Sequence, residues 1–94
     1  MVLPAPWSCR RSADFSLRAW RDGCVLFDEA QGQLQCFTVE SGEVMRLLLQ
    51  RAQWTSSQLA EALLGDVPTD DDVQMVENVA LHFQSLNLIE RLPV

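Results

Sequence analysis

The side chains best suited to chemistry in this chain are a single histidine and three cysteines. His82 has neither a GxSxG motif nor a cysteine close to it in sequence, so it lacks the usual partners of a nucleophilic site. The four glycines are scattered and form no phosphate-binding loop. The thirteen acidic residues single out no carboxylate pair for acid–base catalysis. We therefore expect a binding protein and not an enzyme.

The cysteines stand at positions 9, 24 and 36, without a CxxC pair or a histidine cluster. This odd number and this spacing are untypical of a disulfide framework or a zinc site, and we expect no metal and no cofactor. A hairpin could bring Cys24 and Cys36 together, but we expect two small buried residues in a reducing compartment. The aspartates at positions 70 to 72 suit a helix start better than a calcium loop, in which acidic residues alternate.

Length and composition indicate one folded domain, because the chain has 94 residues of which 48% are hydrophobic. No apolar run approaches the roughly 18 residues that a membrane-spanning helix needs. The first arginines follow the apolar N-terminal residues, which is the reverse of a secretory signal. We therefore expect a cytoplasmic protein that has no membrane partner.

Charge is distributed unevenly along the chain. All seven basic residues are arginine, and four of them lie in the first 21 residues beside one acid, Asp14. That segment carries a net charge of +3, whereas the remainder, with three arginines and twelve acids, carries −9. Affinity for nucleic acid comes mainly from neutralised phosphates, so an acidic body argues against a nucleic-acid partner.

Three short strands are predicted in the first half of the chain. Apolar and polar residues alternate after Phe15, with the two-residue period of a half-buried strand, and Asp22-Gly23 then favours a tight hairpin turn. The unbroken apolar run at 24–27 is typical of a central strand covered on both faces. Residues 34–37 follow after a polar turn. The three strands would form an antiparallel meander with the third strand at one edge.

Three helices are predicted in the second half of the chain. Thr38 can cap the first, because its hydroxyl can accept a hydrogen bond from an early backbone N–H. Thr55 and Thr69 each open a capping-box sequence for the second and third helices. Asn87 is expected to end the third helix in a left-handed conformation.

The third helix carries an apolar arc of about 160°, wider than a one-sided surface helix needs. Its centre is formed by Val73, Val76, Ala80 and Phe83, and it extends over Met75, Val79 and Leu86, with His82 at its border. One flank can fill the core while the other lines a groove. A helix that is simply well buried is the alternative interpretation.

These elements predict an α+β fold of the winged-helix type, a three-stranded antiparallel meander followed by three helices. Residues 1–13 are expected to form a flexible arm and residues 14–94 the folded domain. An unpaired third strand offers free backbone N–H and C=O groups to an extended peptide. The same edge could pair with a second copy, so a homodimer is a further expectation.

The order of the motifs resembles a known family. It is similar to that of the PqqD-like peptide chaperones, also called RiPP recognition elements. The segments that carry the similarity are, in order, DG-CVLFD, a turn with glycine, LQCFTVESGEVMRLL, WTSSQLAEALL and a long helix ending in LNLIE. The resemblance covers about residues 15 to 90. Trp20, Asp22-Gly23 and Phe27-Asp28 resemble the subgroup associated with HPr-kinase-related proteins.

The resemblance implies a peptide-binding adaptor. Such domains bind the leader segment of a ribosomally made precursor peptide and present it to a modifying or kinase-like enzyme. The leader adds as a strand beside the third strand, with its apolar side chains against the last helix. The matching positions are Leu34, Gln35, Cys36, Phe37 and Thr38 on the strand, and Met75, Val79, His82, Phe83 and Leu86 on the helix.

The basic N-terminal arm could assist an acidic leader, chiefly by raising the encounter rate. Two other functions stay open at this point. One is a winged-helix regulator that binds nucleic acid, against which the net charge of −6 argues. The other is a structural subunit that is permanently docked on a partner enzyme.

Overall fold

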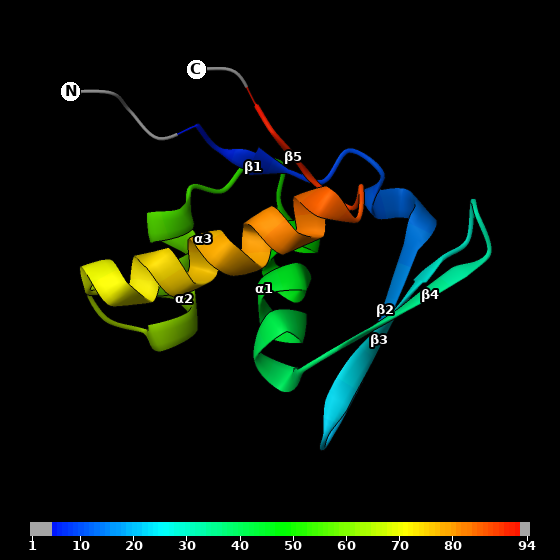
Figure 1. Ribbon diagram of the computed structural model, residues 1–94, viewed down its shortest axis with the longest axis horizontal. Coiled ribbons are helices and arrows are strands. Elements are labelled where there is room, and N and C mark those ends of the chain that lie inside the picture. Colours follow the sequence, from blue (N-terminus) through cyan, green and yellow to red (C-terminus); the bar gives the residue numbers. More distant parts are fainter. Residues whose placement is uncertain (1–4, 93–94) are drawn as a thin grey trace.

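The computed structural model describes residues 5–92, and Figure 1 shows the order of their elements. The fold is α+β, with a three-stranded antiparallel sheet followed by three helices, as predicted. A short strand pair and one 3-10 turn complete it. The elements are β1 (Trp7–Ser8), η1 (Ser12–Asp14), β2 (Phe15–Trp20), β3 (Gly23–Asp28), β4 (Gln33–Phe37), α1 (Val39–Gln50), α2 (Ser56–Leu64), α3 (Asp70–Ser85) and β5 (Glu90–Arg91).

The sheet has the order β2-β3-β4, so the third strand of the meander is an edge strand, as predicted. In the register, Leu26 lies opposite Leu17 on β2 and opposite Gln35 on β4. Gly23 opens the central strand at a point where a Cβ would come within 2.9 Å of the Phe37 carbonyl oxygen. The close approach of β4 therefore favours glycine at this position, and its φ is not in the left-handed region that the sequence pattern of a tight turn had suggested.

The helix ends follow the local signals of the sequence. The hydroxyl of Thr38 accepts a hydrogen bond from the Ser41 N–H at the start of α1. Thr55 and Thr69 each form a complete capping box at the starts of α2 and α3. After α3, Asn87 has a φ of 62°, the left-handed conformation expected for a residue that ends a helix.

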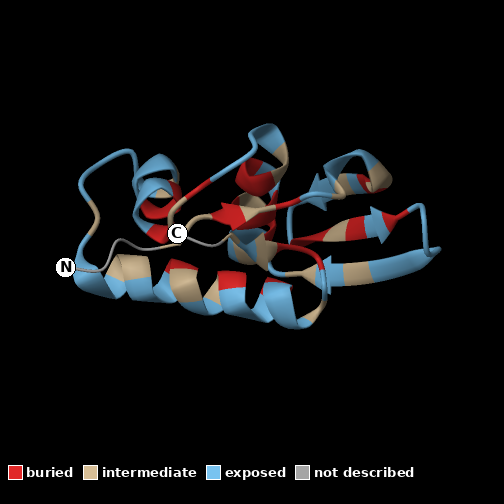
Figure 2. Cartoon of the chain, turned by 90° about the horizontal axis from the view of Figure 1, so that it is seen from above, coloured by how far each residue is buried: buried red, intermediate tan, exposed pale blue. Residues whose placement is uncertain are grey.

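The core lies between the sheet and the helices. Helix α1 packs on the strands with one side and on α2 and α3 with the other (Figure 1). Figure 2 shows that buried residues gather where the helices and β3 face one another. The largest fully buried side chains are Trp7, Phe83, Leu26, Met45, Leu48, Leu59, Val44, Val76 and Cys24.

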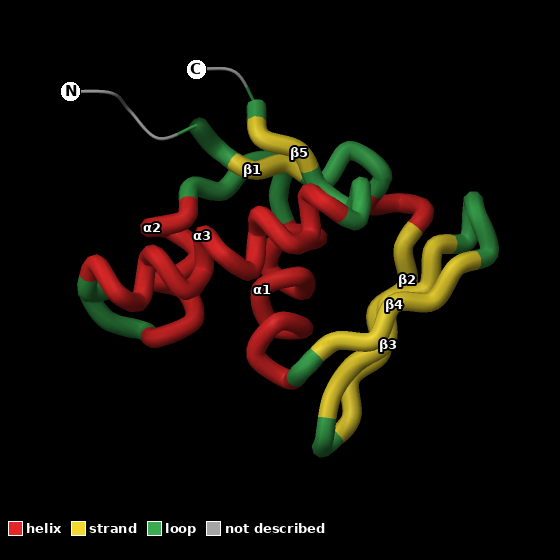
Figure 3. Tube along the Cα trace, viewed as in Figure 1, coloured by secondary structure: helices red, strands yellow, loops and turns green. Residues whose placement is uncertain are grey.

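The prediction of a flexible N-terminal arm is wrong for residues 7–13. Trp7 is completely buried, and β1 pairs antiparallel with β5 near the other end of the chain (Figure 3). The backbones of Trp7 and Trp54 exchange two further hydrogen bonds, of 2.6 and 3.0 Å. The segment is ordered because its tryptophan is part of the buried core and its backbone pairs with β5 and with Trp54.

A chain of polar contacts fixes the same segment to the helices. The Trp7 indole N–H donates to the Ser56 hydroxyl at 3.1 Å, and that hydroxyl donates to Glu77 at 2.6 Å. The Arg91 guanidinium contacts the Glu77 carboxylate at 2.5 Å and stacks over the Trp7 ring at 4.0 Å. Burial raises the pKa of Glu77, but the hydrogen bonds and charge of its partners outweigh burial and hold that pKa below its ordinary value.

Among the described residues, no helix combines the length and the apolar character that crossing a membrane requires.

Candidate peptide-binding site

The free edge of β4 is the central feature of the candidate site. Among residues 5–92, β4 pairs with β3 on one side and with no strand on the other. Its sequence, QLQCF, contains none of the charged residues or prolines with which proteins usually protect an edge strand. Along such an edge, every second residue directs its N–H and C=O groups outward, where a further strand can bind them.

The side chains of β4 alternate between two surroundings. Register with β3 places Gln35 and Phe37 on the face that carries Leu26 and Cys24, toward the helices. Leu34 lies on the opposite face and is 63% exposed. A peptide added to β4 would therefore have one row of side chains next to the helices and one row next to Leu34.

An aromatic contact joins β4 to α3. The ring centroids of Phe37 and Phe83 are 5.0 Å apart and the rings are tilted by 56°. Phe83 is fully buried, so it supports the site from below and cannot contact a bound peptide, in contrast to the prediction. The base of the predicted groove is closed at this position because the two rings fill it.

Four predicted residues of α3 form one stripe along the helix. Met75, Val79, His82 and Leu86 fall within about 60° of each other at 100° per residue. Met75 is 48% exposed and His82 is exposed, whereas Val79 and Leu86 pack partly against the core. The stripe borders the buried row to which Phe83 belongs. Met75 lies about 12 Å along the helix axis from Phe83, so that it marks the distant end of the site.

Thr38 differs from the other predicted strand residues. It follows β4, and its hydroxyl is already engaged as the N-cap of α1. Its side chain therefore defines where the free edge ends and where the helix begins. We assign it a structural role, and the edge strand itself ends at Phe37.

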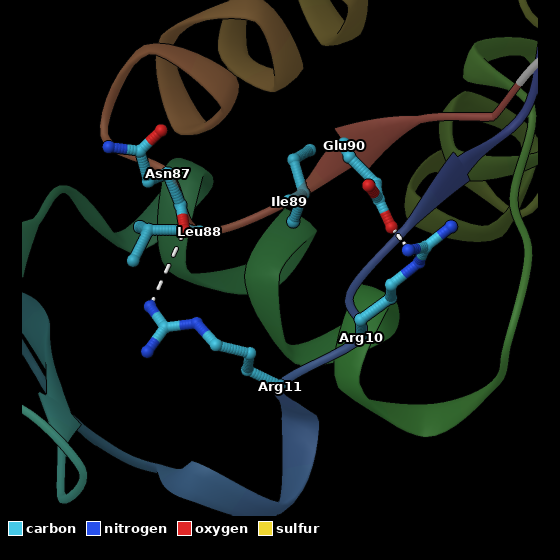
Figure 4. A pocket seen from close by; sticks show the side chains of 6 residues that line it. All are labelled: Arg10, Arg11, Asn87, Leu88, Ile89 and Glu90. Atoms are coloured by element: carbon cyan, nitrogen blue, oxygen red, sulfur yellow. Dashed lines mark hydrogen bonds and ion pairs between the residues drawn. The ribbon is translucent and has the colours of Figure 1, made fainter.

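Two of the four arginines among the first 21 residues, Arg10 and Arg11, are engaged within the protein. Figure 4 shows a surface pocket of about 260 Å³ between the N-terminal segment and the turn after α3. Arg10 forms a salt bridge with Glu90 there, and Arg11 forms one with Asp28 at 3.0 Å and also contacts the Asn87 carbonyl. Carboxylates therefore neutralise these two guanidinium groups, whereas Arg18 and Arg21 form no salt bridge with any described residue.

The cysteines are all free thiols, and their burial corrects one expectation. Cys9 and Cys24 are buried, but Cys36 is exposed. Cys24 lies opposite Phe37 on the face toward the helices, and the alternation of β4 therefore places Cys36 on the other face. Burial raises the pKa of the Cys9 thiol to about 11, despite opposing contacts with Arg11.

The structure has an exposed apolar surface that the sequence does not predict. The apolar run at 24–27 indicates a strand covered on both faces, but the side chain of Phe27 is 37% exposed. An unbroken apolar run cannot show which face of a sheet the helices cover. The signal that was available is the alternation in β2, which places Trp20 on the face away from Phe15.

Comparisons with protein-family models, with curated proteins and with solved structures find no match to this chain.

Proposed function

We propose that this protein is a non-catalytic adaptor that binds the leader segment of a ribosomally made precursor peptide and presents it to a modifying enzyme. The observation that carries the proposal is the free, uncharged edge of β4, which the Phe37–Phe83 contact joins to α3. The resemblance of the motif order to PqqD-like proteins supports the same function. Ribosomal precursors are made in the cytoplasm, where we also place this protein.

Binding would proceed by strand addition. Backbone hydrogen bonds to β4 supply affinity that depends little on sequence, and the surfaces on either side select the side chains. On the helix side, a peptide meets the exposed methionine and histidine of the stripe above the Phe37–Phe83 pair. An extended peptide with apolar residues at alternate positions fits this arrangement best.

The leader is selected mainly by shape and apolar contact. Of the four arginines among the first 21 residues, Arg10 and Arg11 are paired with Glu90 and Asp28, and the first turn of α3 is acidic. A strongly acidic leader would therefore gain little from this surface at physiological ionic strength. A neutral or weakly basic amphipathic segment is the ligand class that the charges favour.

A titration of isotope-labelled protein with the precursor peptide encoded beside its gene tests the proposal. Amide shifts are expected along β4 and on the α3 stripe. Shifts that avoid both regions, or an absence of binding at millimolar peptide, would refute it. Salt-dependent binding of duplex DNA in place of the peptide would support the nucleic-acid function instead.

A matched pair of variants on α3 sharpens this test. Met75 and Leu81 are 48% and 43% exposed on the same helix, but they point in different directions. Met75→Glu places a charge on the stripe and is expected to weaken peptide affinity about tenfold, the equivalent of about 1.4 kcal/mol. Leu81→Glu should change the affinity less than twofold. If the two substitutions changed the peptide affinity equally, the stripe would not be the peptide-binding side of α3.

A further inference from the structure

The face of the sheet that points away from the helices is apolar. The register places apolar side chains from all three strands on it, together with Ser16 and Arg18 of β2. Trp20 is 52% exposed, and the side chains of Phe27, Leu34 and Cys36 are also exposed. The apolar residues of this outer face are Trp20, Val25, Phe27, Leu34 and Cys36. In Figures 1 and 3 the helices lie on the other side of the sheet.

This composition is unusual for the solvent side of an antiparallel sheet, which normally alternates apolar-inward with polar-outward residues. Here both faces of β3 are apolar, because Val25 and Phe27 lie outward while Cys24 and Leu26 lie inward. The proposed peptide site uses the edge of β4 and the helix side, so it leaves most of the outer face unoccupied. Contiguous exposed apolar surface of this kind marks an interaction site.

The charges around the outer face have opposite signs at its two ends. Arg18 lies on the face beside Val25, and Arg21 lies with Asp22 in the β2–β3 turn. Neither arginine forms a salt bridge with any residue in the described part of the chain. At the other end, Glu29 follows β3 and accepts a hydrogen bond of 2.9 Å from the Ser16 hydroxyl. The hydroxyl holds that carboxylate on the outer face, because Ser16 pairs with Phe27.

We propose that the outer face binds the outer face of a second copy of this chain. The two copies are related by a two-fold axis that lies between the two sheets, perpendicular to the strands, and passes between Val25 and Phe27. Under this rotation the face meets the same face of the second copy. The rotation places Val25 over Phe27 of the second copy and Arg18 near Glu29 of the second copy. The unpaired arginine of each copy thus meets the fixed carboxylate of the other, and the two sheets stack at the usual spacing of about 10 Å.

The face is small compared with the interfaces of stable dimers. Three strands at a spacing of about 4.8 Å and a length of about 20 Å give a projected area of about 300 Å². A standard interface buries about 800 Å² per partner, so this dimer is weak, with a Kd of about 10 µM to 1 mM. The free edges of β4 stay available in this arrangement. The inference does not depend on the proposed function.

Sedimentation velocity of the full chain between about 5 µM and 1 mM tests the dimer, with circular dichroism to confirm that each variant is folded. The wild-type sedimentation coefficient should rise with concentration. Phe27→Glu buries a charge between the sheets and should abolish that rise. Val67→Glu is the control, since Val67 is 84% exposed in the loop before α3 and its substitution should change nothing.

A charge exchange tests the two-fold arrangement itself. Arg18→Glu should weaken dimerisation at least tenfold, and combining it with Glu29→Arg should restore the wild-type concentration dependence. A chain that stays monomeric over the whole range overturns the proposal. So does a dimer that tolerates Phe27→Glu, because it would form elsewhere, for instance through the β4 edges. If the Arg18→Glu/Glu29→Arg double variant does not regain the dimerisation that Arg18→Glu loses, the proposed two-fold arrangement is wrong.

Discussion

The N-terminal tryptophan allows the sharpest test of the fold. Trp7 is completely buried, its indole N–H donates to Ser56, and its ring lies under the Arg91 guanidinium. Replacing a buried aromatic residue by alanine usually costs about 3–5 kcal/mol. A domain of this size has a total stability of about 5–15 kcal/mol. Trp7→Ala should therefore remove a large part of the free energy of unfolding, although it changes a residue close to the chain end.

Urea unfolding measures this loss, with far-ultraviolet circular dichroism as the signal and a few micromolar protein. Trp20→Ala is the matched control, because Trp20 is half-exposed and should lose about 1 kcal/mol or less. Trp7→Phe keeps most of the ring but not the donor, so a loss of about 1–2 kcal/mol is expected even if the alanine variant does not fold. Equal losses for Trp7→Ala and Trp20→Ala would mean that the N-terminal segment is loosely held, and would refute the reasoning.

Three further predictions concern single side chains. The folded-state pKa of Glu77 lies below its ordinary value, so its stabilising contribution is complete above the unfolded-state pKa of about 4.3 and is lost as the pH falls through the lower folded-state value. Glu77→Gln should therefore lower the free energy of unfolding at pH 7, measured by urea unfolding. The free energy of unfolding of this variant should also fall less than that of the wild type between pH 7 and about pH 3.5. Gly42→Ala would place a Cβ 2.3 Å from the Cys24 sulfur, and a loss of about 1–3 kcal/mol is expected in thermal unfolding. A thiol reagent should modify only Cys36 in the native protein, and all three cysteines after denaturation, as counted by mass spectrometry.

Each of these predictions has an outcome that contradicts it. A pH dependence that is the same with and without the Glu77 carboxylate would show that its hydrogen bonds do not persist in solution. Adding Cys24→Ala to Gly42→Ala should recover part of the lost stability, and no recovery would argue against the close approach of α1 and β3. Rapid native modification of Cys9, whose thiol pKa burial raises to about 11, would contradict its place in the core.

Local signals predicted the helices correctly. Thr38, Thr55 and Thr69 all cap helices, because a capping hydroxyl bonds to a backbone N–H only three residues away. The left-handed Asn87 and the edge position of β4 were equally accessible, since both depend on neighbouring residues and on the order of short turns. These features were sufficient to locate the candidate edge.

Contacts between distant residues could not be predicted in the same way. Trp7 is buried in a cluster of residues distant in sequence, and its hydrogen-bond acceptor Ser56 is 49 positions away. No periodic pattern in the sequence indicates such a contact. Trp7 lies in a proline-containing segment without periodicity, and that segment therefore suggested a flexible arm. Phe83 illustrates the same limit in the site, because its contact with Phe37 joins two elements that only the folded chain brings together. The α3 arc was recognised, but its division into a buried row and an exposed stripe was not.

The pairing of β1 with β5 has a consequence for how this domain can be joined to other proteins. The Leu92 N–H donates to the Pro6 carbonyl at 2.8 Å, so the chain enters and leaves the fold at adjacent points. A host protein could carry the domain as an insertion that spans only a narrow gap between two of its own residues. A short linker between these points would likewise permit circular permutation with new termini in an exposed loop, such as the one before α3. Neither change would obstruct the sheet, which lies in another part of the molecule (Figure 1).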